Sequence, residues 1–190
     1  MAAMPAGEKI MAGAFQSVTT RTAGFNSIDQ NGLYGGSFLL TIILMFIGAA
    51  PGSTGGGIKV SRVLILLKSV KKELKQYLHP SAVEKIKMDG KIVEHEVVRS
   101  TNVFMVAYVL IFAVSVLLIS LDEYDLVTNF TAVTATFNNI GPGLALVGPT
   151  GNFGFFSNFS KVVLIFDMLA GRLEIFPLLL LFSRETWKRF

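Results

Sequence analysis

The chain has 190 residues, of which 52% are apolar and 16% are charged, with a mean hydropathy of +0.57. An ordinary soluble domain carries about 25% charged residues, so this composition predicts an integral membrane protein. The formal net charge is +4, and the absence of cysteine excludes disulfides and thiolate metal sites. No nucleophile, base and orienting group come together in the sequence. We therefore expect neither an enzyme nor an organic cofactor, and no nucleic-acid partner.

The chain opens on a short stretch compatible with a helix, EKIMAGAFQ, and continues into a polar stretch, SVTTRTAGFN. The polar stretch, Ser17 to Asn26, is rich in hydroxyls and precedes a long apolar segment. We expect it to lie on the outer side of the membrane, at the tip of a descending half-helix.

The first long apolar segment, Gly36 to Leu67, is interrupted by GAAPGSTGGGIK. Residues Ser37 to Ile47 are too few to cross a bilayer, which needs about 20 apolar residues, and Pro51 and five glycines break the helix after them. Irregular backbone inside a membrane is tolerated only where protein encloses it or it lines a watery cavity. Such an interruption points to a transport pathway. A phosphate-binding loop is not indicated, because Ile58 stands where that motif needs lysine.

The connection after this segment is rich in lysine, and the extreme C-terminus is basic. The positive-inside rule places both in the cytoplasm, whereas the acidic stretch DEYD, Asp122 to Asp125, is expected outside. Within the connection, Asp89-Gly90 stands between two alternating runs, which predicts a two-residue β-hairpin. A plain surface hairpin and a docking platform are both compatible with this pattern.

The second half of the chain predicts one simple span and one re-entrant loop. Thr101 to Leu121 is long enough to cross the membrane once. Leu126 to Phe137 is long enough to enter only halfway, and the glycine- and proline-rich stretch after it is not helical. A last apolar segment, Phe156 to Phe182, contains ionisable residues, which usually face a partner or water. These residues are Lys161, Asp167, Arg172 and Glu174.

The polar stretch and NNIGPG each follow a half-helix and precede a span, which makes an internal repeat. A cation filter needs backbone carbonyls that replace the ion's hydration shell, and glycine permits that backbone. The half-helices direct the negative ends of their dipoles toward a cation. Each segment is predicted to form one wall of a cation pore, although turn glycines are the plainer alternative. The predicted filter residues are Thr22, Ala23, Gly24, Asn139, Ile140 and Gly141.

Four motifs, TTRTAGFN, APGSTGGGIKVSR, ATFNNIGPGLALVGPTGNF and AGRLEIFP, together resemble the C-terminal half of the Trk/Ktr potassium-uptake membrane subunits. The match covers essentially the whole chain. That family has four potassium-channel-like repeats of helix, pore loop and helix. The resemblance implies that Gly24 and Gly141 are the filter glycines of the third and fourth repeats.

The resemblance also implies that the loop from Gly48 to Gly57 is an intramembrane gate below the filter, and that Arg172 of the last helix meets it. Lys59 borders this loop, and a gating role and simple snorkelling toward the headgroups are equally compatible with its position. The predicted gate residues are Gly52, Gly55, Gly56, Gly57, Lys59 and Arg172.

The predicted fold is an all-α membrane protein with potassium-channel-like helix/pore-loop/helix repeats, re-entrant half-helices and a broken transmembrane helix. Residues 1–74 are expected to hold the third pore half-helix, filter and broken inner helix. Residues 75–99 are expected to form the cytoplasmic connection, and residues 100–190 the fourth repeat. The predicted function is K⁺ uptake by a multi-pass protein of the cytoplasmic (inner) membrane, with Na⁺ left open.

The resemblance implies a homodimer of full-length subunits and a cytosolic ring of nucleotide-binding regulatory subunits, which the lysine-rich connection would contact. Two filter segments cannot enclose an ion by themselves, so we expect a truncated chain whose N-terminal repeats are missing. An independent half that pairs with another polypeptide is the alternative. The competing function is a non-conducting fragment or accessory subunit that assembles with a complete transporter.

Overall fold

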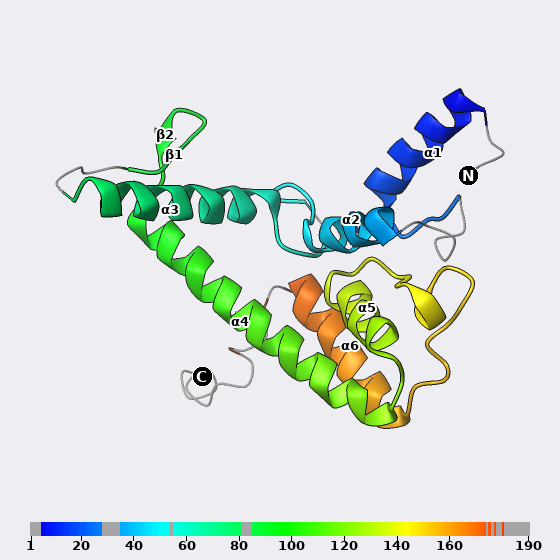
Figure 1. Ribbon diagram of the computed structural model, residues 1–190. Coiled ribbons are helices and arrows are strands. Elements are labelled where there is room, and N and C mark those ends of the chain that lie inside the picture. The colour runs from blue at the N-terminus through cyan, green and yellow to red at the C-terminus, as the bar shows by residue number, and fades with distance from the viewer. Residues whose placement is uncertain are drawn as a thin grey trace.

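The computed structural model describes residues 5–27, 35–53, 55–80 and 85–173, together with residues 175, 177 and 180. Their regular secondary structure is helical apart from one small hairpin (Figure 1). Glu174, the end of the predicted last segment and the basic C-terminus lie outside the described residues. The elements are α1 (Ala6–Thr19), α2 (Gly35–Phe46), α3 (Val60–Leu78), β1 (Lys87–Met88), β2 (Lys91–Ile92), α4 (His95–Ile119), η1 (Ser120–Asp122), α5 (Leu126–Phe137), η2 (Ala145–Val147) and α6 (Asn158–Leu173).

The long helix α4 is the element that can cross a membrane by itself. Together with η1 it forms an apolar stretch from His95 to Asp122, the only stretch of this kind among the described residues. The predicted span began later, at Thr101. The helix starts earlier because the amides of Val97 and Val98 already donate to the Glu94 carbonyl. Hydropathy marks where the membrane begins, whereas backbone hydrogen bonds decide where the helix begins.

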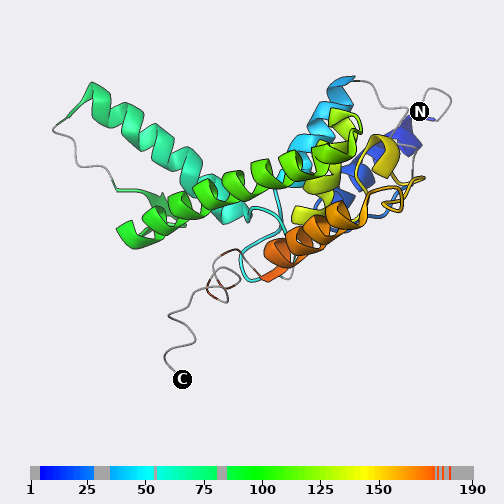
Figure 2. The same ribbon diagram turned by 90° about the horizontal axis from the view of Figure 1, so that it is seen from below.

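Seen from below, α4 runs from the hairpin end of the molecule to the end where α5 and α6 pack against it (Figure 2). The buried residues of α4 recur at helical spacing along the face that it turns toward the core. They are Thr101, Phe104, Tyr108, Ser115 and Ile119. The opposite face exposes valine and leucine, as a helix in contact with lipid does.

The half-helix α5 is the core of the fold, and its bounds are those predicted from the sequence. It contacts α2, α4 and α6, and every residue from Thr131 to Phe137 is buried. Its threonines are satisfied within the helix. The hydroxyls of Thr131, Thr134 and Thr136 donate to the carbonyls four residues earlier, at 2.7 to 2.9 Å. A polar helix can therefore be buried, because buried polar groups cost little free energy when they are hydrogen-bonded.

Asp125 caps the N-terminus of α5. Its carboxylate accepts from the Thr128 amide at 3.0 Å and from the Thr128 hydroxyl at 2.6 Å. These hydrogen bonds hold the pKa of Asp125 below its ordinary value, and the hydrogen bond from the Thr128 hydroxyl makes the largest contribution. The carboxylate form is therefore the form that the folded chain stabilises.

Replacing Asp125 by Ala is expected to destabilise the fold by about 1 kcal/mol, the usual cost of losing an N-cap. Because the folded pKa is lowered, this stabilisation is complete above the ordinary aspartate pKa of about 3.9 and disappears as the pH falls below it. Thermal unfolding in detergent, at neutral pH and in acid, checks this. Asp125→Asn is the control, since asparagine also caps a helix but does not titrate. Equal melting temperatures for Asp125→Ala and the unchanged chain at neutral pH would contradict the assignment.

The last helix, α6, starts at Asn158 because the Ser157 hydroxyl accepts from the Ser160 amide at 3.2 Å. The predicted apolar segment began two residues earlier, at Phe156. The ionisable Asp167 is completely buried, and its carboxyl group accepts from the Ser115 hydroxyl of α4 at 2.7 Å. This contact ties α6 to α4, and the other carboxyl oxygen of Asp167 has no hydrogen-bond partner among the described residues.

The predicted hairpin is present, with Asp89 and Gly90 at positive φ of 49° and 78°. These angles suit the two-residue turn that the right-handed strand twist favours. The Lys68 ammonium donates to the Lys87 carbonyl at 2.6 Å, so the hairpin is attached to α3. The expected division of the chain at residues 74 and 99 falls inside α3 and α4, which continue across those positions.

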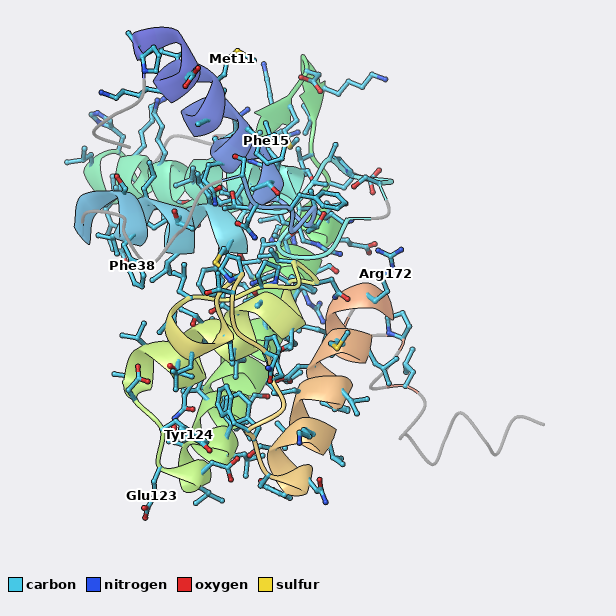
Figure 3. All side chains as sticks on the ribbon, turned by 90° about the vertical axis from the view of Figure 1, so that its right-hand side faces the viewer. Met11, Phe15, Phe38, Glu123, Tyr124 and Arg172 are labelled. Carbon is cyan, nitrogen blue, oxygen red and sulfur yellow. The ribbon has the colours of Figure 1, made fainter. Side chains whose placement is uncertain are left out.

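Helix α1 projects from the rest of the molecule (Figure 1). Met11 and Phe15 lie along it, above α5 and α6 (Figure 3), and they are 75% and 45% exposed. Only Gln16 and Thr19 of this helix are buried. The described part of the chain thus leaves an apolar face of α1 uncovered.

Candidate functional site

The first predicted filter segment follows α1 directly. The amides of Ala23 and Gly24 both donate to the Thr19 carbonyl, at 3.2 and 3.0 Å, so the chain turns tightly where the helix ends. The Thr19 hydroxyl donates to the Phe25 carbonyl at 2.5 Å and holds the far end of the segment. Thr22 and Gly24 have positive φ of 72° and 75°. Left-handed conformations therefore occur at alternate residues.

The second predicted filter segment follows α5 and repeats this backbone. Asn139 and Gly141 have positive φ of 55° and 110°, again at alternate residues. The Ile140 amide between them donates to the Ala135 carbonyl at 2.9 Å. The sequence repeat therefore corresponds to a repeat of backbone conformation.

The two segments lie side by side. A side chain at Gly24 would collide with the Ile140 carbonyl, and its Cβ would lie 3.1 Å from Cδ of Pro142. The space left between the segments is only about 10 Å³. Gly141 is different, because no atom lies within 4 Å of where its Cβ would be. A hollow of about 640 Å³ opens beside Gly141, between the second segment and α6.

The glycine-rich loop between α2 and α3 is closed at its base. The Gly48 amide donates to the Ile58 carbonyl at 2.9 Å, and the Ile58 amide donates to the Phe46 carbonyl at 3.1 Å. The two ends of the loop are therefore hydrogen-bonded to each other, and α2 and α3 remain separate helices on either side of it. The glycines between these ends form a projecting loop.

This loop lies against both filter segments. A Cβ at Gly56 would collide with the backbone carbonyl of Asn138 in the second segment. A Cβ at Gly55 would lie 3.0 Å from the Thr22 hydroxyl of the first. Only glycine fits this closely against a neighbouring backbone. The structure thus brings together the predicted filter residues and the predicted loop residues, which come from separate parts of the chain.

Asn138, one residue before the predicted second wall, anchors it to α4. Its side-chain oxygen accepts from the Tyr108 hydroxyl at 2.7 Å, and its side-chain nitrogen donates to the Thr134 carbonyl at 2.9 Å. Asn138 is completely buried. Its hydrogen bonds fix the backbone carbonyl that Gly56 contacts, next to the predicted filter residues.

Replacing Tyr108 by Phe is expected to destabilise the fold by about 1–3 kcal/mol, since it leaves a buried amide oxygen of Asn138 without its donor. The matched control is Tyr124→Phe. The Tyr124 hydroxyl donates to the Phe155 carbonyl at 3.1 Å near the surface, where water replaces it. Chemical unfolding of both variants checks the difference. A smaller loss for Tyr108→Phe than for Tyr124→Phe would contradict this role.

Lys59 is folded back onto the loop. Its ammonium donates to the Ser53 carbonyl at 2.9 Å and to the Gly55 carbonyl at 2.6 Å. Its side chain therefore does not extend toward the headgroups, which was the snorkelling alternative. Hydrogen bonds from a charged donor are stronger than those between neutral groups. Lys59 therefore restrains the conformation of the loop.

Arg172 lies at the end of α6 and shares a cavity of about 300 Å³ with the loop. Gly52, Gly55, Gly57 and Lys59 line the same cavity, so five of the predicted gate residues meet there. The sixth, Gly56, faces the filter. Arg172 is exposed in this chain, on the side of α6 seen in Figure 3.

Three residues of this site were not singled out from the sequence. They are Tyr108, Asn138 and Gly171. A Cβ at Gly171 would collide with the Phe137 carbonyl and lie 2.6 Å from the Asn139 side-chain nitrogen, so this glycine lets α6 approach the second filter segment. Its place directly before Arg172 was the available signal. Tyr108 gave no signal, because a tyrosine in an apolar span is ordinary.

The acidic connection after α4 lies toward one end of α6 and Arg172 toward the other, and Lys161 of α6 lies near the acidic connection. Glu123 and Tyr124 mark one end of the helices, and Arg172 lies toward the other end (Figure 3). At the acidic end, the Ser157 amide donates to the Asp122 carboxylate at 2.9 Å, and this hydrogen bond lowers the pKa of Asp122, to which Lys161 also contributes. An acidic connection at one end and an arginine at the other agree with the predicted orientation.

Comparison with known proteins identifies relatives along almost the whole chain. A family model described as "TrkH: Cation transport protein" matches residues 1–189. The Trk system potassium uptake protein TrkH of Escherichia coli K12 is 41% identical over 180 residues, which cover 92% of this chain and 36% of that protein. TrkH of Vibrio parahaemolyticus is 42% identical over 178 residues, with coverages of 92% and 36%.

The fold agrees with a solved structure. The crystal structure of the potassium transporter TrkH from Vibrio parahaemolyticus matches with a TM-score of 0.88 at 38% identity. The match covers 98% of this chain and 40% of that one. The chain therefore spans little more than a third of the length of these relatives.

Proposed function

Because the chain belongs to the TrkH cation transport family, we propose that it forms part of a K⁺ uptake pathway across the cytoplasmic membrane. It supplies two walls of a carbonyl-lined filter, from Thr22 to Gly24 and from Asn139 to Gly141. The observation that carries this proposal is the repeated backbone of these segments, with left-handed residues at equivalent positions and direct contact between them. K⁺ is the transported ion, and the other walls come from repeats outside this chain.

The glycine-rich loop is the gate in this proposal. It lies against both filter segments, so an ion that leaves the filter meets it next. Its base is fixed by backbone hydrogen bonds, whereas Gly52, Gly55, Gly56 and Gly57 let the projecting part change conformation at low cost. Lys59 holds two carbonyls of the loop, and Arg172 lines the cavity beside it.

The assembly that this function needs is larger than the chain. We propose that the working transporter is a multi-pass homodimer in the lipid bilayer of the inner membrane. Its filter includes N-terminal repeats of the same transporter, and cytosolic nucleotide-binding subunits regulate it. The uncovered apolar face of α1 and the open hollow beside Gly141 support this arrangement, since both are surfaces that further helices would cover.

A second candidate is a non-conducting fragment or accessory subunit that assembles with a complete transporter. The same uncovered faces are compatible with it. The two candidates differ in what the filter residues do: a non-conducting partner does not depend on the left-handed backbone of Gly24 and Gly141.

The test is K⁺ uptake in cells that lack their own potassium transporters. One strain carries this chain alone, and another carries a chimera in which it replaces the matching third of the Escherichia coli relative. We expect the chimera to restore growth at low K⁺. Growth with the chain alone would mean that copies of it assemble into a pore. A chimera that reaches the membrane without supporting uptake would contradict the proposed function.

A further inference from the structure

Helix α3 carries two separate surfaces along its length. Only Ile65 of its residues is buried, so most of the helix is covered neither by α4 nor by the hairpin. Large apolar side chains along it are 59% to 85% exposed from Leu67 onward. These are Leu67, Val70, Leu74, Tyr77 and Leu78. At 3.6 residues per turn they fall within about 100° of arc, so they form one apolar stripe.

The lysines of α3 lie beside this stripe. Lys68, Lys71, Lys72 and Lys75 follow the spacing of one helix face, adjacent to the stripe. Lys68 donates to the hairpin, and the other three continue along the helix beyond it. An apolar stripe beside a row of lysines is the pattern of a helix that lies in the membrane interface.

The position of α3 relative to the membrane follows from its contact with α4. A groove between them is lined by Ser69, Lys72 and Glu73 of α3 and by His95, Arg99 and Asn102 of α4. This is where α4 changes from a charged first turn to the apolar run that crosses the bilayer. The middle of α3 therefore lies at the level of the cytoplasmic membrane surface.

We propose that this face of α3 binds the anionic lipid surface of the cytoplasmic leaflet. Leu67, Val70 and Leu74 enter the acyl boundary, and Tyr77 lies at the headgroup level that amphipathic aromatic residues prefer. Lys71, Lys72 and Lys75 contact the lipid phosphates. The negative potential of that leaflet complements the lysines, and each lysine near it contributes about a fivefold gain in affinity.

This surface has a consequence for the glycine loop. Helix α3 begins directly after Lys59, which holds the loop carbonyls. Anionic lipid bound along α3 therefore fixes the helix that follows the loop. The lipid contact itself does not depend on the proposed transport function, so it can be tested without measuring uptake.

The test places a fluorophore in the stripe. The variant is Tyr77→Trp combined with Trp187→Phe, so that position 77 holds the single tryptophan of the chain. The protein is reconstituted into vesicles of phosphatidylcholine with a minor fraction of phosphatidylglycerol, with bromine on one lipid or the other. We expect stronger quenching by brominated phosphatidylglycerol than its share of the lipid explains. We expect this preference to weaken at high salt.

Replacing Lys71, Lys72 and Lys75 together by Gln is expected to lower the preference for phosphatidylglycerol over phosphatidylcholine by up to about a hundredfold. The variant should then bind the two lipids equally well. The matched control replaces Lys85, Lys87 and Lys91 of the hairpin region, which changes the charge equally and is expected to leave the preference intact. Unchanged total quenching, with bromine on both lipids, shows that the variant is still inserted.

Two results would overturn the proposal. Absence of quenching by either lipid would mean that the stripe does not contact lipid, because a second copy covers it or because it lies in water. Quenching by each lipid in proportion to its share of the bilayer, with the lysines unchanged, would mean that α3 contacts acyl chains but recognises no anionic headgroup.

Discussion

Replacing Gly141 by Ser is expected to abolish K⁺ uptake by the chimera without removing it from the membrane. The reason is conformational. Gly141 has a φ of 110°, which a residue with a side chain rarely adopts, although no atom lies near enough to clash with that side chain. The strain, of order 1–3 kcal/mol, is relieved by turning the backbone, which moves the carbonyls that replace the hydration shell of K⁺.

The measurement is the initial rate of uptake at low external K⁺, normalised to the amount of protein in the membrane. Gly24→Ala tests the other wall, where both the positive φ and a collision with the Ile140 carbonyl oppose a side chain. Gly13→Ala is the control, because Gly13 lies in α1 with no neighbour within 4 Å and no positive φ. Full uptake by Gly141→Ser would show that this glycine does not shape the filter.

Replacing Lys59 by Met is expected to raise K⁺ flux through the chimera about tenfold or more. Methionine has a similar length but no donor, so the Ser53 and Gly55 carbonyls lose the ammonium that holds them. A hydrogen bond to a charged group contributes about 1.5–3 kcal/mol, and each 1.4 kcal/mol changes a population about tenfold. The loop should therefore leave the filter exit more often.

This flux is measured as K⁺ loss from loaded cells transferred to K⁺-free medium, since an opened gate also permits efflux. Lys68→Met is the control: it removes a lysine of the same region whose ammonium bonds to the hairpin and not to the loop. A lower flux for Lys59→Met would mean that Lys59 supports ion passage, and the role assigned to it would be wrong.

Much of the fold was predictable from local chemistry. α5 has the predicted bounds because Asp125 caps one end and the polar Asn138-Asn139 pair ends it at the other. The break between α2 and α3 follows from Pro51 and the glycines, and the hairpin follows from Asp89-Gly90. Helix α4 begins before the predicted span, because its charged first turn is helical but not apolar.

The candidate site was predictable in part. The repeated motif and the glycines indicated the filter segments and the loop, and the family resemblance assigned Arg172 to the loop. Tyr108, Asn138 and Gly171 were not predicted, since each acts through a partner far away in the chain. Tyr108 and Asn138 are 30 residues apart, yet they share a hydrogen bond. Periodicity and spacing contain no information about such pairs.

The sequence by itself was therefore sufficient to predict the membrane class, the half-helices and the irregular segments. These features depend on the hydropathy, capping and backbone freedom of residues that are neighbours in the chain. Packing in three dimensions decided the rest. It placed Gly56 against the Asn138 carbonyl and Gly24 against the Ile140 carbonyl, and it turned Lys59 toward the loop. These contacts join segments whose relative position depends on how α2, α4 and α6 pack around α5, and that packing is a property of the whole fold.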